Sequence, residues 1–178
     1  YAAYRLMQSL WISDRRNLER FVSMQMQYSL VSRQIELEHV PVARDHGVGI
    51  LPWGPLAGGF LTGKVAHHGE PPDGSRLSKW VWQMEQLDRE RCWKVLGVLR
   101  DVADAIEASP SQVALAWCMR KPEVTSVIFG ARTIEQYEDN AGALDVELPD
   151  ELFTRLEQAS AFPLPYPYDF LETVNKTW

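Results

Sequence analysis

The chain has 178 residues, a mass of 20.4 kDa and a formal net charge of −6. With 46% hydrophobic and 24% charged residues it is neither disordered nor collagen-like, and its length fits one domain with a substantial core. The pI near 5.2 argues against a nucleic-acid-binding protein. No apolar run approaches the about 20 residues of a membrane helix, so we expect no membrane association.

The chain starts at Tyr1 without an initiator methionine and without a basic or apolar leader. We therefore expect a piece of a longer, cytoplasmic protein. Cys92 and Cys118 lie in helical patterns without metal-ligand spacing, which predicts two reduced, buried thiols. His67, His68 and Glu70 share a Gly/Pro-containing loop, where a solvated loop is favoured over a metal site.

The amino-terminal part predicts a helix, a strand and a second helix in chain order. Residues 4–18 follow a helical pattern, with a possible break at Ser13 and Asp14. Polar and apolar residues alternate over 21–28, as in a strand. Residues 36–46 form a helix that includes Pro41 and ends before Gly47.

The rest of the chain continues this alternation. Short apolar runs at 48–52 and 124–129 predict strands buried on both faces, as in parallel sheets. Ser109, Pro110 and Gln112 form a helix-start signal, and Thr133 with Gln136 repeats it. The predicted helices cover 92–106, 109 to just before Pro122, 133–144 and 150–160, and the aromatic, proline-rich tail from residue 161 is expected to lie across a surface.

Strands that alternate with helices indicate an α/β fold with a parallel sheet. Three strands make a thin domain, and a complete (β/α)8 barrel typically needs about 250 residues. Three consecutive strand–helix units after a leading helix therefore look like part of such a barrel.

The segment from Ile50 to Lys64 (ILPWGPLAGGFLTGK) is the richest in features. A buried strand ends at Pro52, Trp53 follows at the end where parallel α/β folds bind ligands, and a glycine-rich turn comes next. Glycines let backbone N–H groups approach an anion, but the P-loop spacing is absent. A phosphate cradle and a purely structural turn both fit this segment, as do ring stacking and core packing for Trp53.

A second turn follows the last predicted strand. Arg132 precedes a capped helix, and a guanidinium beside a helix N-terminus suits a phosphate. A solvated surface arginine is the alternative. On the first strand, Gln25 interrupts an apolar stretch, and a buried amide there needs a hydrogen-bond partner from the backbone or from an amide-bearing ligand.

Three motifs in this order resemble the aldo-keto reductase family, in the branch of bacterial reductases and potassium-channel β subunits. They are QMQYSLVSR from Gln25, WGPLAGG…LTGK from Trp53, and GAR…Q…N from Gly130, with SPSQVALAW between the last two. The resemblance covers residues 1–160 as the carboxyl-terminal part of the barrel, with 161–178 as its tail. It implies that the three strands are the sixth, seventh and eighth of a (β/α)8 TIM barrel.

The resemblance also implies a cofactor, NADPH, which the basic Arg132 favours over NADH. By family pattern, Gln25 would hold the nicotinamide carboxamide and Trp53 would stack on its ring. The pyrophosphate would lie on the turn, with two basic residues near the phosphates: Gly54, Pro55, Leu56, Ala57, Gly58, Lys64 and Arg76. The adenosine end would contact Gly130, Arg132, Gln136, Asp139 and Asn140, under a belt formed by residues 65–79.

The family's Asp, Tyr, Lys and His catalytic set has no counterpart in this chain, and Tyr28 belongs to a strand motif rather than to that set. We expect no metal. Two hypotheses remain: part of an NADPH-dependent reductase of aldehydes or ketones, or a non-catalytic NADPH-binding regulatory subunit or half-barrel. An isolated half-barrel would expose its sheet edges, so the missing amino-terminal half or self-association should cover them.

Overall fold

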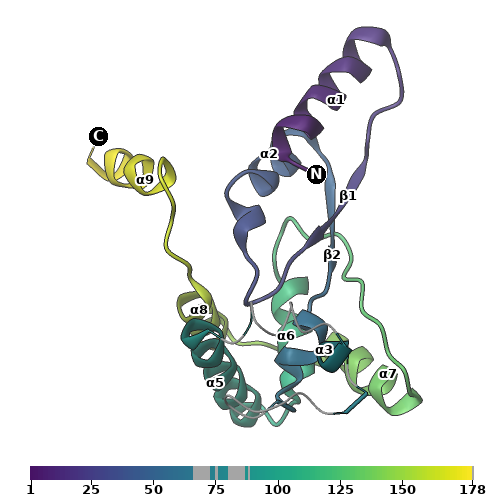
Figure 1. Cartoon of the computed structure of the whole chain (residues 1–178), viewed down its shortest axis with the longest axis vertical. Helices are drawn as coiled ribbons and strands as arrows, with labels where there is room; N and C mark the ends of the chain where they lie inside the picture. The colour runs from purple at the N-terminus through teal and green to yellow at the C-terminus, as the bar shows by residue number, and fades with distance from the viewer. Residues whose placement is uncertain (66–72, 75, 80–86, 88, 178) are drawn as a thin grey trace.

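A computed structural model describes residues 1–65, 73–74, 76–79, 87 and 89–177, with the side chains of Arg76 and 175–177 excepted. The chain alternates strands with helices, as Figure 1 shows. In chain order the elements are α1 (Ala3–Arg16), β1 (Ser23–Gln27), η1 (Gln34–Glu36), α2 (His39–His46), β2 (Gly49–Trp53), η2 (Ala57–Thr62), α3 (Arg76–Lys79), α5 (Glu90–Ala105), α6 (Pro110–Met119), α7 (Ile134–Ala141), η3 (Gly142–Asp145), α8 (Asp150–Ser160) and α9 (Tyr168–Thr177), where η marks a 3-10 helix.

β1 and β2 form a parallel pair in which Ser23 lies opposite Gly49 and Gln27 opposite Trp53. The predicted third strand is only partly present, because residues 124–128 join β2 through isolated parallel bridges at Ile50 and Trp53. Ile50 hydrogen-bonds to that segment through both its N–H and its carbonyl. Backbone groups two residues apart on a strand point to the same side, so the backbone of Pro52 also faces residues 124–128. Proline has no N–H to donate, and this interrupts the ladder between the two bridges.

The main core lies where α5, α6 and α8 pack together. α6 is buried almost all round, and its neighbour α5 buries one face. The helix-start signal at Ser109 is confirmed: its hydroxyl accepts from the Gln112 N–H, and the Gln112 side chain accepts from the Ser109 N–H. This capping box fixes the start of α6.

α1 is continuous, so the break expected at Ser13 is wrong. Ser13 donates its hydroxyl to the carbonyl of Glu19, beyond the end of the helix, and the left-handed Asn17 ends it. Leu6 and Leu10 are buried, whereas Tyr4 and Trp11 are 64% and 56% exposed. α1 thus has one packed face and one open apolar face.

The carboxyl-terminal tail carries a helix, α9, that the sequence did not predict. Figure 1 shows α9 apart from the body of the molecule at the end of an extended connection. The Tyr168 hydroxyl donates to the Glu38 carboxylate next to α2, while Phe170 is exposed. The tail therefore ends in a helix that contacts Glu38 through Tyr168.

Both cysteines are free and buried, as predicted, and burial raises the pKa of the Cys118 thiol to about 12. Within the ranges given above, no helix has the length and hydropathy to cross a bilayer. The same residues contain no group of three metal-ligating side chains. The loop with His67, His68 and Glu70 lies outside the described residues.

Candidate functional site

Three chain segments end at the same edge of the sheet. β1 ends beside β2, where the Tyr28 N–H donates to the Trp53 carbonyl at 3.3 Å. Trp53 also bridges to Ile128, which comes two residues before Gly130. The parallel arrangement therefore brings the ends of β1, β2 and 124–128 together, the usual place for a ligand in parallel α/β folds.

Gln25 and Trp53 lie on one face of the β1–β2 pair. Gln25 is opposite Leu51, and side chains two residues apart on a strand share a face, so Trp53 lies diagonally next to Gln25. Trp53 is 42% exposed, and Gln25 is exposed as well. The premise that Gln25 is a buried amide is therefore wrong in this chain, where its amide is open to a ligand or to solvent.

The turn after β2 is built on left-handed backbone. Gly54 has φ +65°, and Ala57, Gly58 and Gly59 follow with φ of +49°, +68° and +107°. A side chain at Gly54 would meet nothing within 4 Å, so a ligand can approach the backbone there. The N–H groups of Ala57 and Gly59 donate within the turn, to the carbonyls of Gly54 and Leu56. Pro55 is buried and Leu56 half-buried.

Lys64, at the end of this turn, is exposed. Its two neighbours are held by Arg100 of α5, whose Nη2 donates to the carbonyl of Gly63 at 2.6 Å and to that of Val65 at 3.2 Å. Sequence reasoning missed Arg100, because its partners are 35 and 37 residues away. The Arg76 side chain lies outside the described residues, as does most of the predicted belt.

The residues assigned to the adenosine end lie on the turn after Gly130 and on α7. The Gln136 side chain accepts from the Arg132 N–H at 3.0 Å, and the Thr133 hydroxyl caps the helix as predicted. Arg132 also donates through Nη1 to the Gly74 carbonyl at 2.6 Å, so it joins this turn to the belt segment. Asp139 and Asn140 lie further along α7.

Asn140 is only 5% exposed, so its side chain lies mostly inside the protein. The backbone at Gly54 is open, and the Trp53 indole is exposed at the same edge.

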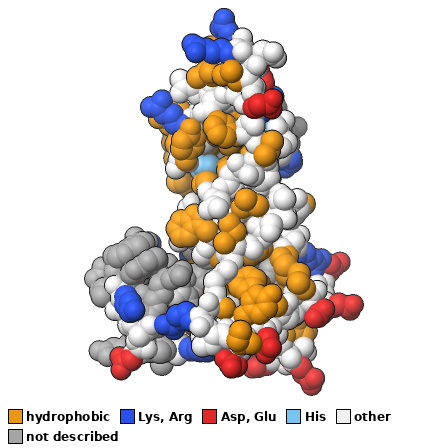
Figure 2. All heavy atoms as spheres, turned by 90° about the vertical axis from the view of Figure 1, so that its right-hand side faces the viewer, with side chains coloured by type: hydrophobic (Ala, Val, Ile, Leu, Met, Phe, Trp, Pro, Cys, Tyr) orange, Lys and Arg blue, Asp and Glu red, His pale blue; other side chains and the backbone are white. Residues whose placement is uncertain are grey.

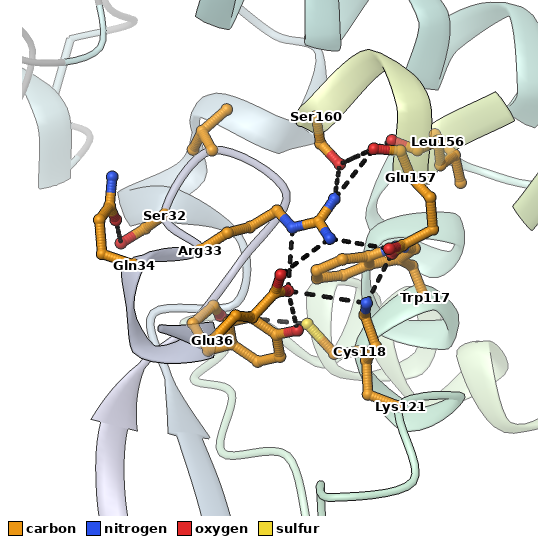
Figure 3. Close-up of polar contacts among 12 residues, drawn as sticks. Ser32, Arg33, Gln34, Glu36, Trp117, Cys118, Lys121, Leu156, Glu157 and Ser160 are labelled. Atoms are coloured by element: carbon orange, nitrogen blue, oxygen red, sulfur yellow. Dashed lines mark hydrogen bonds and ion pairs between the residues drawn. The ribbon is translucent and has the colours of Figure 1, made fainter. Parts of the chain in front are cut away.

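A partly buried polar cluster joins η1 to α8, and sequence reasoning missed it (Figure 3). Arg33 is at its centre and binds Glu36 of η1 and Glu157 of α8. Lys121 binds the same two carboxylates, at 3.6 and 2.7 Å. We name these four residues the Arg33 cluster. Its formal charge is balanced, as buried ion groups require.

The Arg33 cluster also affects the protonation of the Tyr28 hydroxyl. Burial and the hydrogen bond to Glu36 strongly raise the pKa of its hydroxyl. The side chain is fully buried, and its hydroxyl donates to Glu36 at 2.5 Å. The Tyr28 hydroxyl is therefore engaged with Glu36 inside the protein.

The family model for the aldo/keto reductase family matches residues 3–161. The chain belongs to this family. Its curated relatives include an uncharacterized oxidoreductase, YrpG, of Bacillus subtilis, 32% identical over 93% of this chain and 48% of YrpG. Protein tas of Escherichia coli is 31% identical over 92% of this chain and 47% of its own length.

A probable voltage-gated potassium channel subunit β of Arabidopsis thaliana is 33% identical over 82% of this chain and 45% of its own length. This aldo/keto reductase chain thus resembles both an oxidoreductase and a channel subunit. It spans about half the length of these relatives. Family membership implies a TIM-barrel fold, of which the described residues show a small parallel sheet with flanking helices.

Proposed function

We propose that this chain is the cofactor-binding part of an NADPH-dependent carbonyl reductase that converts aldehydes or ketones to alcohols. The observation that carries the proposal is the meeting of the three segment ends, which places Trp53, the glycine turn and Arg132 along one edge. Membership of the aldo/keto reductase family and a relative described as an oxidoreductase support it.

Each residue has a role in this proposal. The bound nicotinamide supplies a hydride for the carbonyl carbon. Trp53 would stack on one face of the ring, and Gln25 would hold its carboxamide. The open backbone at Gly54, with Lys64 and Arg76, would hold the phosphates, and Arg132 would pair with a 2′-phosphate. The proton for the carbonyl oxygen would come from the part of the protein outside this chain.

Cofactor titration tests this proposal. We expect tryptophan fluorescence of the chain to be quenched by NADPH, and Trp53→Phe to remove most of that signal. Arg132→Gln should weaken NADPH binding at least tenfold and leave NADH binding within twofold, because only NADPH carries the extra phosphate. The control Arg20→Gln breaks an exposed ion pair with Asp14, far from the site, and should change neither. Equal losses for both cofactors would contradict the assignment of Arg132.

We further infer that this chain is the second half of a barrel, completed by strand–helix units that precede it. Its length, about half that of the relatives, supports this inference. An open apolar flank on α1 and on the two residues just before β1 supports it as well. Tyr4, Trp11, Phe21 and Val22 of this flank are 64%, 56%, 56% and 78% exposed. Figure 2 shows apolar side chains along the face that includes these elements.

Sedimentation velocity tests the completion of the barrel. The chain alone should self-associate, and Trp11→Ser with Val22→Ser should reduce this. Co-expression with the amino-terminal half of the Bacillus subtilis relative should give a one-to-one complex instead. Ile134→Ser, an equally exposed site on α7, is the control and should change neither result. A stable monomer that forms no complex with the co-expressed amino-terminal half would contradict the inference.

A non-catalytic NADPH-binding regulatory subunit is the second candidate, favoured by the 33% identity to a probable potassium channel subunit β. The two candidates differ in turnover rather than in binding. The full-length protein, loaded with NADPH and mixed with an aldehyde, should oxidise the cofactor in a single turnover if it is a reductase. Binding without oxidation would favour the regulatory subunit.

A further inference from the structure

We propose that Arg33 is a positioning residue for the cofactor site. Through Tyr28, the Arg33 cluster holds the carboxyl ends of β1 and β2 against the helices, and with them the pair Gln25 and Trp53. This inference rests on the proposed function, because it assigns Arg33 to the nicotinamide end of that site.

Arg33 uses all of its donors within the protein. A guanidinium has five N–H groups, and Arg33 makes five hydrogen bonds with them (Figure 3). Two go to the Glu36 carboxylate, both at 2.9 Å, and one to Glu157 Oε2 at 2.7 Å. The others go to the Glu157 carbonyl at 3.0 Å and to the Ser160 hydroxyl at 2.6 Å. A lysine could not reproduce this planar set.

Three further contacts make the cluster rigid. The Trp117 indole N–H donates to Glu157 Oε1 at 2.7 Å, and its ring lies under the Arg33 and Lys121 cations at 5.4 and 4.9 Å. Arg33 is only 6% exposed. Burial by itself lowers the pKa of Arg33, but the hydrogen bond and charge of Glu36 and the charge of Glu157 outweigh it, so Arg33 stays charged.

Tyr28 connects the cluster to the strand ends. Its hydroxyl donates to Glu36, its ring packs on Trp117 with centroids 5.3 Å apart, and its N–H donates to the Trp53 carbonyl. Tyr28 comes directly after β1, three residues beyond Gln25. A displacement of Glu36 would therefore move Tyr28, and Tyr28 would in turn move the strand ends that carry Gln25 and Trp53.

The adenosine end is held differently. Arg132 and Gln136 bond to each other, and Arg132 bonds to Gly74. Loss of Arg33 should therefore affect the nicotinamide end and spare the adenosine end. A general loss of stability would affect both ends alike.

Binding of NADPH and of 2′-phospho-ADP-ribose, which lacks the nicotinamide, separates these two cases. Isothermal titration of the chain compares wild type with Arg33→Lys and with Tyr28→Phe, which removes only the hydroxyl. The matched control is Arg155→Met, which breaks an exposed ion pair between α8 and Asp101. We expect Arg33→Lys to weaken NADPH binding at least tenfold and 2′-phospho-ADP-ribose binding less than twofold. Tyr28→Phe should act in the same direction with a smaller change, and the control should match wild type.

Amide hydrogen exchange gives a readout that needs no ligand. In Arg33→Lys the Tyr28 N–H, at the carboxyl end of the strand pair, should exchange at least tenfold faster. The Gly49 N–H, which donates to the Val22 carbonyl at the other end, should be unchanged. Equal acceleration at both ends, or equal loss of both ligands, would overturn the positioning role. Failure of the wild-type chain to bind either ligand would overturn the proposed function, while exchange would still decide whether Arg33 holds the strand ends.

Discussion

α6 and α1 are both rich in apolar residues, and the structure treats them in opposite ways. α6 buries all but a few of its side chains, with Trp117 fully covered by neighbouring elements. α1 buries Leu6 and Leu10 but leaves Tyr4 and Trp11 open. Among the described residues, this face of α1 has no covering neighbour, as the proposed completion of the barrel requires. The comparison therefore divides the molecule into a packed region around α5, α6 and α8 and an open region at α1 and β1.

The same substitution in the two regions should sharpen this division most strongly. Leu99→Ala in α5 should lower the free energy of unfolding by about 2–5 kcal/mol, because Leu99 is fully buried and leaves a cavity. Leu18→Ala, after α1, should change it by less than about 0.5 kcal/mol, because Leu18 is 56% exposed. Urea denaturation measures both. Similar losses would show that the open region is as tightly packed as the core.

Ion pairs in the packed region should differ from those on its surface. Lys121→Met leaves Glu36 and Glu157 short of a cation in a partly buried cluster, so we expect a loss of about 3 kcal/mol. Asp101→Asn breaks the exposed pair with Arg155 and should cost less than about 1 kcal/mol. Thermal unfolding followed by circular dichroism compares them, and a cost for Asp101→Asn that equals that of Lys121→Met would contradict the distinction.

The two capped helices allow a finer comparison. Ser109→Ala removes a reciprocal cap inside the packed region and should cost about 1 kcal/mol. Thr133→Ala removes a single capping bond on the exposed α7 and should cost about 0.5 kcal/mol. Both values follow from urea midpoints at constant slope. The reverse order would mean that burial does not strengthen the cap.

The smallest expected effect is on the acid side of the stability profile. Burial raises the pKa of Glu157, but Lys121 and Arg33 outweigh it, so its folded value lies below 4.5. The Glu157 carboxyl therefore binds a proton more tightly in the unfolded chain than in the folded one. Its contribution to the free energy of unfolding is complete above pH 4.5 and is lost as the pH falls through its folded pKa. Glu157→Gln should flatten this part of the profile, measured by urea unfolding at several acid pH values. Glu151→Gln, at an exposed site on the same helix, should leave it unchanged.

Local signals predicted much of the fold. Alternation of polar and apolar residues predicted β1, an apolar run predicted β2, and Ser109 predicted the start of α6 to the residue. The third strand was overestimated, because its partner Pro52 cannot donate and only contact with that partner reveals the loss. The order of the motifs also predicted the family, which the match over residues 3–161 confirms.

In the candidate site, too, some features are local in sequence and others depend on the fold. Sequence determined which residue types follow each strand, since the glycine-rich turn and the position of Arg132 just before a capped helix are local features. Local sequence could not predict that Gln25 is exposed, because exposure depends on what packs against that face of the strand. Asn140 was named from the family pattern, but its burial is visible only in three dimensions.

By itself, then, the sequence determined the alternation of strands and helices, the caps and the family, because these depend on residues a few positions apart. The tertiary structure alone decided the Arg33 cluster, whose Arg33–Glu157 bond joins residues 124 positions apart. It also decided which apolar faces are covered, and that the tail folds into α9 with Tyr168 bonded to Glu38. Ion pairing and burial depend on distance in space, and the chain sets that distance only when it folds.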